Sequence, residues 1–206
     1  FKDDFEGSIR PEWVNYADGF AVTSARSQRG NYSVTTPIQD RYLRYDLGVP
    51  MQDLTFEGWF FDSQTAEPYE TTLEASRDTG SGIAVGIDTF FDQSHYVYRL
   101  GAFNWVSTSI TRSDGWHLGQ IYRGIGKLHI LIDRKMVYQE TGGNDFVRFV
   151  SLATNGAAGR NPPTPYYLDN VRLYQGSPVP EPTAFQIIVF SLLAAVALRL
   201  VRSRRR

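Results

Sequence analysis

The chain has 206 residues, of which 42% are hydrophobic and 14% aromatic, and this composition predicts a folded protein and excludes a disordered one. Cysteine is absent, which excludes disulfides, cysteine-ligated zinc, iron–sulfur clusters and thiol nucleophiles. The net charge of −1 divides unevenly: residues 177–206 hold five arginines and one acid, which leaves 16 basic and 21 acidic residues, a net of −5, in residues 1–176. We therefore expect no nucleic-acid partner for this mildly acidic body.

Residues 1–176 are a succession of short segments that alternate between apolar and polar residues. Leu128, Ile130 and Ile132 share one face of such a segment, while His129 lies on the other. Turn signals such as "SDG" at 113–115 separate the segments, and no helical period is long enough for βαβ units. This spacing predicts an all-β antiparallel sandwich or barrel. The expected strands are 20–24, 31–36, 41–47, 54–61, 71–76, 82–88, 95–100, 103–110, 116–122, 127–132, 136–140, 147–153 and 166–174.

The stretch "DGWHLGQIYRGIGKLHILIDRKMVYQE" (114–140) resembles the laminin-G/concanavalin A-like pattern. Trp116 and His117 match its "WH" pair, and Arg134 stands where the family usually has glycine. The segments "DDFEGSIRPEW", "SQRGNYSV" and "YYLDNVRLY" are similar to bacterial lectin-like jelly rolls. The resemblance implies an antiparallel jelly-roll sandwich over residues 1–176, with its first and last strands side by side.

The sequence offers little sign of catalysis. A laminarinase-type glycoside hydrolase on this fold would have E-x-D-x-x-E on one strand, which directs its carboxylates into a cleft. The acidic stretch Glu67, Glu70, Glu74 and Asp78 lacks this spacing and is interpreted as a solvated loop and edge strand. Nucleophile-elbow, zincin, P-loop and dinucleotide motifs are also absent, and the three histidines fall in separate strands. We therefore expect a protein that is not an enzyme.

The jelly-roll resemblance also implies a structural calcium ion between the first and last strands. Calcium prefers hard oxygen ligands, and the expected ligands are Asp4, Glu6 and Asp169. The alternative is that Asp169 faces solvent or bonds the backbone, and that the N-terminal acids only aid solubility. No other cofactor is expected.

Sugar binding would require exposed aromatic side chains, because the C–H faces of sugars stack on such rings. The surface candidates are Trp105, Tyr96 and Tyr98, whereas Trp59 and Trp116 are assigned to the core. The alternative is that most of these aromatic side chains serve packing alone.

The C-terminal thirty residues contain a Pro-rich linker (177–183), an apolar run (184–201) and a basic tail (202–206). The run of 18 residues is close to the roughly 20 that cross a bilayer as a helix, and we expect it to be a transmembrane helix. Arginines at its end keep that end cytoplasmic by the positive-inside rule, so the β-domain faces outward. These topology anchors are Arg199, Arg202, Arg204, Arg205 and Arg206.

"VPEP" (Val179, Pro180, Glu181 and Pro182), followed by this helix and the arginines, resembles the PEP-CTERM sorting signal of Gram-negative bacteria. The resemblance implies processing by an exosortase and a location in the cell envelope, with release to the surface or matrix after cleavage. We therefore expect an exported, non-enzymatic, carbohydrate-binding or adhesive protein with polysaccharide as its partner. Two alternatives stay open: a divergent glycoside hydrolase or lyase of this fold, and a purely structural envelope protein that binds no glycan.

Overall fold

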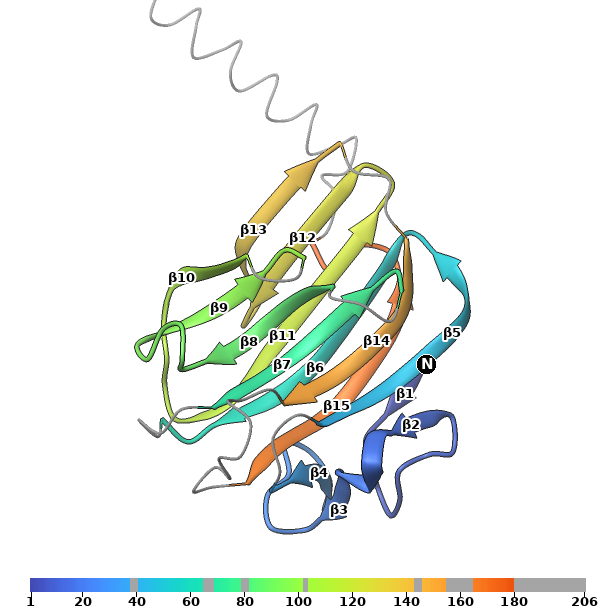
Figure 1. The fold of residues 1–206 in the computed structure, drawn as a ribbon, viewed down its shortest axis with the longest axis vertical. Helices are drawn as coiled ribbons and strands as arrows, with labels where there is room; N and C mark the ends of the chain where they lie inside the picture. Colours follow the sequence, from blue (N-terminus) through green and yellow to red (C-terminus); the bar gives the residue numbers. More distant parts are fainter. Residues whose placement is uncertain are drawn as a thin grey trace, which may run out of the picture.

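The computed structural model describes residues 1–37, 41–64, 69–78, 82–101, 104–142, 146–154 and 165–179. Two antiparallel sheets lie face to face in a sandwich (Figure 1). A short 3₁₀ helix, η1, covers Tyr16–Asp18. The strands are β1 (Lys2–Asp3), β2 (Trp13–Asn15), β3 (Ala21–Thr23), β4 (Ser33–Thr36), β5 (Arg41–Met51), β6 (Leu54–Asp62), β7 (Glu70–Ser76), β8 (Ile83–Asp88), β9 (His95–Arg99), β10 (Trp105–Thr111), β11 (Gly115–Gly124), β12 (Lys127–Ile132), β13 (Lys135–Thr141), β14 (Val147–Thr154) and β15 (Tyr166–Gln175).

Each sheet mixes strands that are distant in the sequence. Sheet A has the order β13-β12-β11-β6-β15-β4-β3, with β1 paired to β15. Sheet B has the order β10-β9-β8-β7-β14-β5-β2 and lies in front in Figure 1. The expected all-β antiparallel sandwich is confirmed, and each of the expected strands overlaps an observed one.

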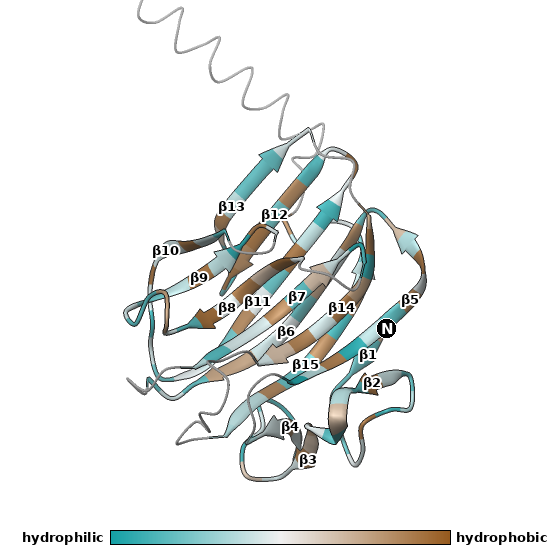
Figure 2. Ribbon diagram, in the orientation of Figure 1, coloured by the Kyte–Doolittle hydropathy of each residue, from teal (hydrophilic) through white to brown (hydrophobic). Residues whose placement is uncertain are grey.

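The core forms because each strand turns its apolar residues inward. On β12, Leu128, Ile130 and Ile132 are buried in the sandwich, as the alternation predicts. On β7 the inward residue is Leu73, which packs close to Gly58 of the facing sheet. Hydrophobic and hydrophilic residues alternate along the strands in Figure 2. Every second residue of a central strand therefore points away from the core, onto the outer face of its sheet.

The first and last strands pair, as the family resemblance implies. Lys2 lies opposite Arg172, and Asp3 opposite Val171. Asp3 is buried and accepts hydrogen bonds from the amide of Phe5 at 2.9 Å and from Nε1 of Trp13 at 2.8 Å. The sequence did not predict β1 or β2, and both are held by this carboxylate.

The C-terminal predictions fall mostly outside the described residues. Of the expected cleavage motif only Val179 is described, and the helix expected at 184–201 and the basic tail at 202–206 are not. Within the described ranges, no helix has the length and apolar character needed to span a bilayer.

His117 is buried in the core and joins the start of β11 to the turn between β12 and β13. Its Nδ1 lies 2.8 Å from Oδ2 of Asp133, and its Nε2 lies 2.9 Å from the carbonyl oxygen of Ser113. A carbonyl can only accept, so Nε2 donates, and Nδ1 donates to the carboxylate. Burial lowers the pKa of His117, but the hydrogen bond and charge of Asp133 outweigh it, so the pKa is raised overall. The turn itself places Asp133 and Arg134 at φ values of 49° and 64°, without the glycine typical of the family.

We predict that the stability of the domain falls as pH rises above neutrality because of His117. The pKa of His117 in the folded state lies above the unfolded value of about 6.5. Its contribution to the free energy of unfolding is therefore fully present below the unfolded pKa and is lost as pH rises through the folded pKa. Urea unfolding between pH 6 and 9 should show this decline, and His117→Gln should flatten it. An equally steep decline in the variant would contradict this assignment.

Candidate active site

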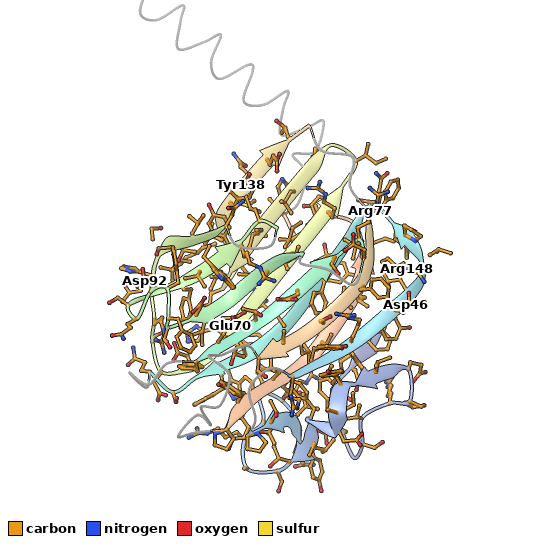
Figure 3. The ribbon with its side chains drawn as sticks, in the orientation of Figure 1. Asp46, Glu70, Arg77, Asp92, Tyr138 and Arg148 are labelled. Atoms are coloured by element: carbon orange, nitrogen blue, oxygen red, sulfur yellow. The ribbon has the colours of Figure 1, made fainter. Side chains whose placement is uncertain are left out.

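Strand β7 presents two glutamates on the outer face of sheet B. Because Leu73 points inward, Glu70, Thr72 and Glu74 point outward. The strand is the middle one of seven in the sheet, and Glu70 is only 6% exposed. Interpreting this stretch as a solvated loop and edge strand was therefore wrong for residues 70–76; Glu67 lies outside the described residues. Figure 3 labels Glu70 on the sheet that lies in front.

A third carboxylate, Asp88, lies beside Glu70. Asp88 ends β8 directly opposite Glu70, where Cβ atoms are typically about 4.5–5.5 Å apart. Its Oδ1 accepts hydrogen bonds from the amides of Phe90 at 2.9 Å and Phe91 at 3.2 Å, which fixes the turn after the strand. Burial raises the pKa of Asp88 against the opposing effect of these two amides. The site thus combines two neighbouring carboxyl groups, one of which holds its proton to higher pH than an ordinary aspartate.

Glu74 forms an ion pair with Arg99 of β9, which is separated from β7 by strand β8. Nη2 of Arg99 lies 2.6 Å from Oε1 of Glu74, and both side chains are largely buried. Ala84 lies between them on β8, and its small side chain leaves room for Arg99 to reach across. The guanidinium of Arg99 also lies over the ring of Trp105, 4.9 Å from its centroid. The Glu74–Arg99 ion pair and the indole ring of Trp105 therefore lie in one row that crosses the strands of sheet B.

The same line continues past β7 toward the other edge of the sheet. Ser151 of β14 lies opposite Glu74, and Arg44 of β5 lies opposite Ser151. Arg44 lies over the ring of Tyr42, 4.3 Å from its centroid. The polar row from Trp105 to Arg44 runs across the strands, which is the direction in which an extended chain could contact several of them.

Of the three aromatic residues proposed for sugar binding, one lies on this face. Trp105 is partly exposed beside Arg99. The assignment of Tyr96 and Tyr98 was wrong, because residues two apart share a face and that face is the core: Tyr96 is 0% and Tyr98 8% exposed. Tyr96 packs against Phe60 instead.

The expected calcium ligands engage other groups. Asp4 pairs with Lys2 at 2.9 Å on the surface. Glu6 accepts hydrogen bonds from the amides of Asn31 and Tyr32, whereas Asp169 accepts from Gln28, Arg29 and Asn170. Burial raises the pKa of Asp169 to about 6 although these amides lower it. Among the described residues no three His, Cys, Asp or Glu side chains gather as a metal-binding group, so Asp4, Glu6 and Asp169 do not form one. Calcium stays a prediction.

No sequence motif marks Asp88 and Arg99 as functional, and Glu70 and Glu74 were interpreted as parts of a solvated loop and edge strand. The available signal was "ETTLE" at 70–74, because two glutamates four residues apart in a strand share one face. The motif that was sought contains aspartate near the centre of this run, where this chain has Thr72. Asp88 supplies the negative charge that Thr72 lacks, but it comes from the neighbouring strand. Only the register of β7 and β8 shows that Asp88 lies opposite Glu70.

Comparisons with known proteins bear on the fold of the described domain. The sequence matches no protein-family model and no curated protein. Among solved structures, a family 16 glycoside hydrolase from Bacteroides ovatus, in complex with a mixed-linkage glucan product, is 12% identical with a TM-score of 0.55, covering 84% of this chain and 99% of that one. The transglycosylase Crh5 is 14% identical with a TM-score of 0.58, covering 87% and 85%. A botulinum neurotoxin binding domain is 13% identical with a TM-score of 0.51, covering 83% and 46%.

These likenesses establish the concanavalin A-like jelly-roll fold of the described domain. They also correct the leading functional expectation. A non-enzymatic adhesive protein was expected, but the similar structures include a glycoside hydrolase and a transglycosylase. The expectation rested on the absence of an E-x-D-x-x-E strand and of other catalytic motifs, whereas the structure places Glu70, Glu74 and Asp88 together on neighbouring strands of sheet B.

Proposed function

We propose that the β-domain is a divergent glycoside hydrolase that cleaves a polysaccharide lying across the outer face of sheet B. The observation that carries the proposal is the group of three carboxylates, Glu70, Glu74 and Asp88, on the two central strands β7 and β8. Glycosidic bond cleavage commonly uses two carboxyl groups in different protonation states. The likeness to a hydrolase and a transglycosylase supports the proposal at the level of fold.

Each carboxylate has an assigned role. Asp88, with its raised pKa, is the general acid that protonates the leaving-group oxygen. Glu70 is the nucleophile, because cross-strand neighbours allow the short separation, about 5–5.5 Å, of retaining enzymes. Glu70 would form a bond to the anomeric carbon as the leaving oxygen departs with the proton of Asp88. Water then attacks that carbon, Asp88 accepts a proton from the water, and the bond to Glu70 breaks to free its carboxylate.

Glu74 and Arg99 bind and position the chain in this scheme. The ion pair fixes both side chains, and Trp105 beside it offers a ring on which a sugar can stack. The line of these residues across the strands places the sugar chain perpendicular to β7.

The test is incubation of the full chain with a panel of polysaccharides, including mixed-linkage β-glucan, β-1,3-glucan and chitin. Reducing ends are counted and products are identified by mass, with and without an added oligosaccharide acceptor. We expect cleavage of at least one polymer, with products of retained anomeric configuration. If every polymer stays intact while the domain binds it, the hydrolase proposal fails and binding alone accounts for the fold.

We also propose that residues 177–206 are a sorting segment that is processed in the cell envelope of a Gram-negative bacterium. Support comes from the sequence alone, in the order of "VPEP", the apolar run and the terminal arginines. We predict that the protein recovered from its own envelope lacks the residues after about Pro182, and intact-mass measurement checks this. If the recovered protein has the full mass, the chain is not cleaved by an exosortase, and the C-terminal segment would act only as a single-helix membrane anchor.

A further inference from the structure

The outer face of sheet A, on the opposite side of the sandwich from Glu70, contains a cavity of about 670 Å³. Its floor is formed by outward residues of the neighbouring strands β11, β6 and β15, and Pro178 and Val179 contribute to its wall. This volume falls in the range of sites for small ligands or short oligosaccharides. The hydrolase site does not include any of the residues that line it.

A buried carboxylate organises the floor. Glu57 is 9% exposed, and its Oε2 accepts hydrogen bonds from Nε2 of Gln120 at 2.8 Å and from the hydroxyl of Tyr174 at 3.1 Å. Nη1 of Arg172 lies 3.8 Å from its other oxygen. The carboxylate can only accept, so it fixes which end of the Gln120 amide faces it. The floor is therefore preorganised.

Gln120 has an acceptor atom that no described residue satisfies. Its Oε1 is buried and receives no hydrogen bond from the described part of the chain, and the residue is only 5% exposed. Oδ1 of Asn170, which also lines the cavity, likewise has no donor among these residues, while the amide nitrogen of Asn170 donates to Gln28. An unmade hydrogen bond at a buried polar atom is costly, because that atom has lost its water without gaining a partner. A ligand that donates hydroxyl groups would satisfy both atoms.

The remaining lining residues determine the class of that ligand. Trp59 points outward from β6 and provides an aromatic surface, so its assignment to the core was wrong. The same cavity is also lined by three arginines, Arg29, Arg134 and Arg172. A guanidinium group can donate two parallel hydrogen bonds to one carboxylate. Hydroxyl donors, a flat C–H face and a negative group occur together in acidic sugars.

We propose that this cavity binds an acidic sugar, of the uronic acid class, as a second carbohydrate site on the face opposite the hydrolase site. The sugar ring stacks on Trp59, its hydroxyl groups donate to Gln120 and Asn170, and its carboxylate meets the arginines. The proposal does not depend on the hydrolase assignment, because the two sites share no residue.

The test measures binding of tri-galacturonate to the full chain by titration calorimetry, with its methyl ester as the matched neutral probe. We expect the ester to bind at least tenfold more weakly, and the affinity of the acid to fall as salt rises. Trp59→Ala should weaken binding of the acid at least tenfold. Trp116→Ala is the control, because Trp116 packs against Phe61 and is not among the residues that line the cavity. Trp116 also points to the outer face of sheet A, so its assignment to the core was wrong as well. Glu70→Gln should leave binding unchanged.

Several outcomes would overturn the proposal. These are equal binding of acid and ester, binding that survives loss of Trp59, and no binding of the acid to the folded wild-type chain. If Trp59→Ala fails to fold, the comparison of acid and ester on wild type and on Arg134→Met decides the question. Tight acid binding that is lost in Glu70→Gln but not in Arg134→Met would place the ligand on sheet B instead.

Discussion

Glu70→Gln should reduce the rate of polysaccharide cleavage by about 10²–10⁴-fold, the range that one reacting carboxyl group commonly contributes. The amide keeps the shape of the side chain but can neither form the glycosyl–enzyme bond nor carry charge. Binding of the polymer should change little, because Trp105 and the Glu74–Arg99 pair remain in place. Initial rates on the polymer cleaved by wild type, together with its dissociation constant, check both statements. Glu12→Gln, on an exposed turn, is the control.

Asp88→Asn separates the two carboxyl roles. As the general acid, Asp88 is required for a poor leaving group but much less for an activated aryl glycoside, whose leaving oxygen needs no proton. The variant should therefore lose activity on polymer and keep most of it on the aryl substrate. Because the pKa of Asp88 is raised, activity of wild type should decline on the alkaline side as this group loses its proton. If Glu74→Gln abolishes cleavage while Glu70→Gln and Asp88→Asn do not, the reacting pair has been misassigned.

The alternation of β7 was present in the sequence, yet its meaning depended on where the strand lies. The two glutamates of "ETTLE" share a face in any strand, but at a sheet edge they would be solvated. In the middle of seven strands Glu70 is buried, and the side chain of Glu74 is only 17% exposed. Strand order comes from contacts between distant segments, such as Leu73 with Leu152 of β14. Local pattern does not encode these contacts, so the site could not be located from the strand alone.

Register limits the prediction of side-chain partners in the same way. Tyr96 and Tyr98 share one face of their strand because they are two residues apart, but the sequence did not decide whether that face was core or surface. Trp59 shows the opposite error: it lies within the apolar run "FEGWFF", and yet alternation puts it outside with Glu57. The fold class was predictable because it depends on the number and spacing of strands. The sites were not, because they depend on which strands are neighbours.

A second network is buried inside the sandwich and bears on stability. Asp62 is completely buried and accepts two hydrogen bonds from Arg112, at 2.9 Å from Nε and 2.7 Å from Nη2. The hydroxyl of Tyr69 donates to the same carboxylate at 3.0 Å, and Nη1 of Arg112 donates to the carbonyl of Gln93. Burial raises the pKa of the Tyr69 phenol, so Tyr69 stays a neutral donor. Every charge in this group is thus matched by a partner.

Arg112→Met should destabilise the domain by about 3–5 kcal/mol, because it leaves the carboxylate of Asp62 buried without its counter-charge. Asp62→Leu alone should cost a similar amount, since the guanidinium is then unpaired. The double variant should lose much less than the sum of the two, because neither charge remains to be desolvated. Urea unfolding of the four proteins gives the coupling free energy directly. Additive losses would mean that solvent reaches the pair and screens it, and the buried position of the two side chains, 3% and 0% exposed, argues for strong coupling.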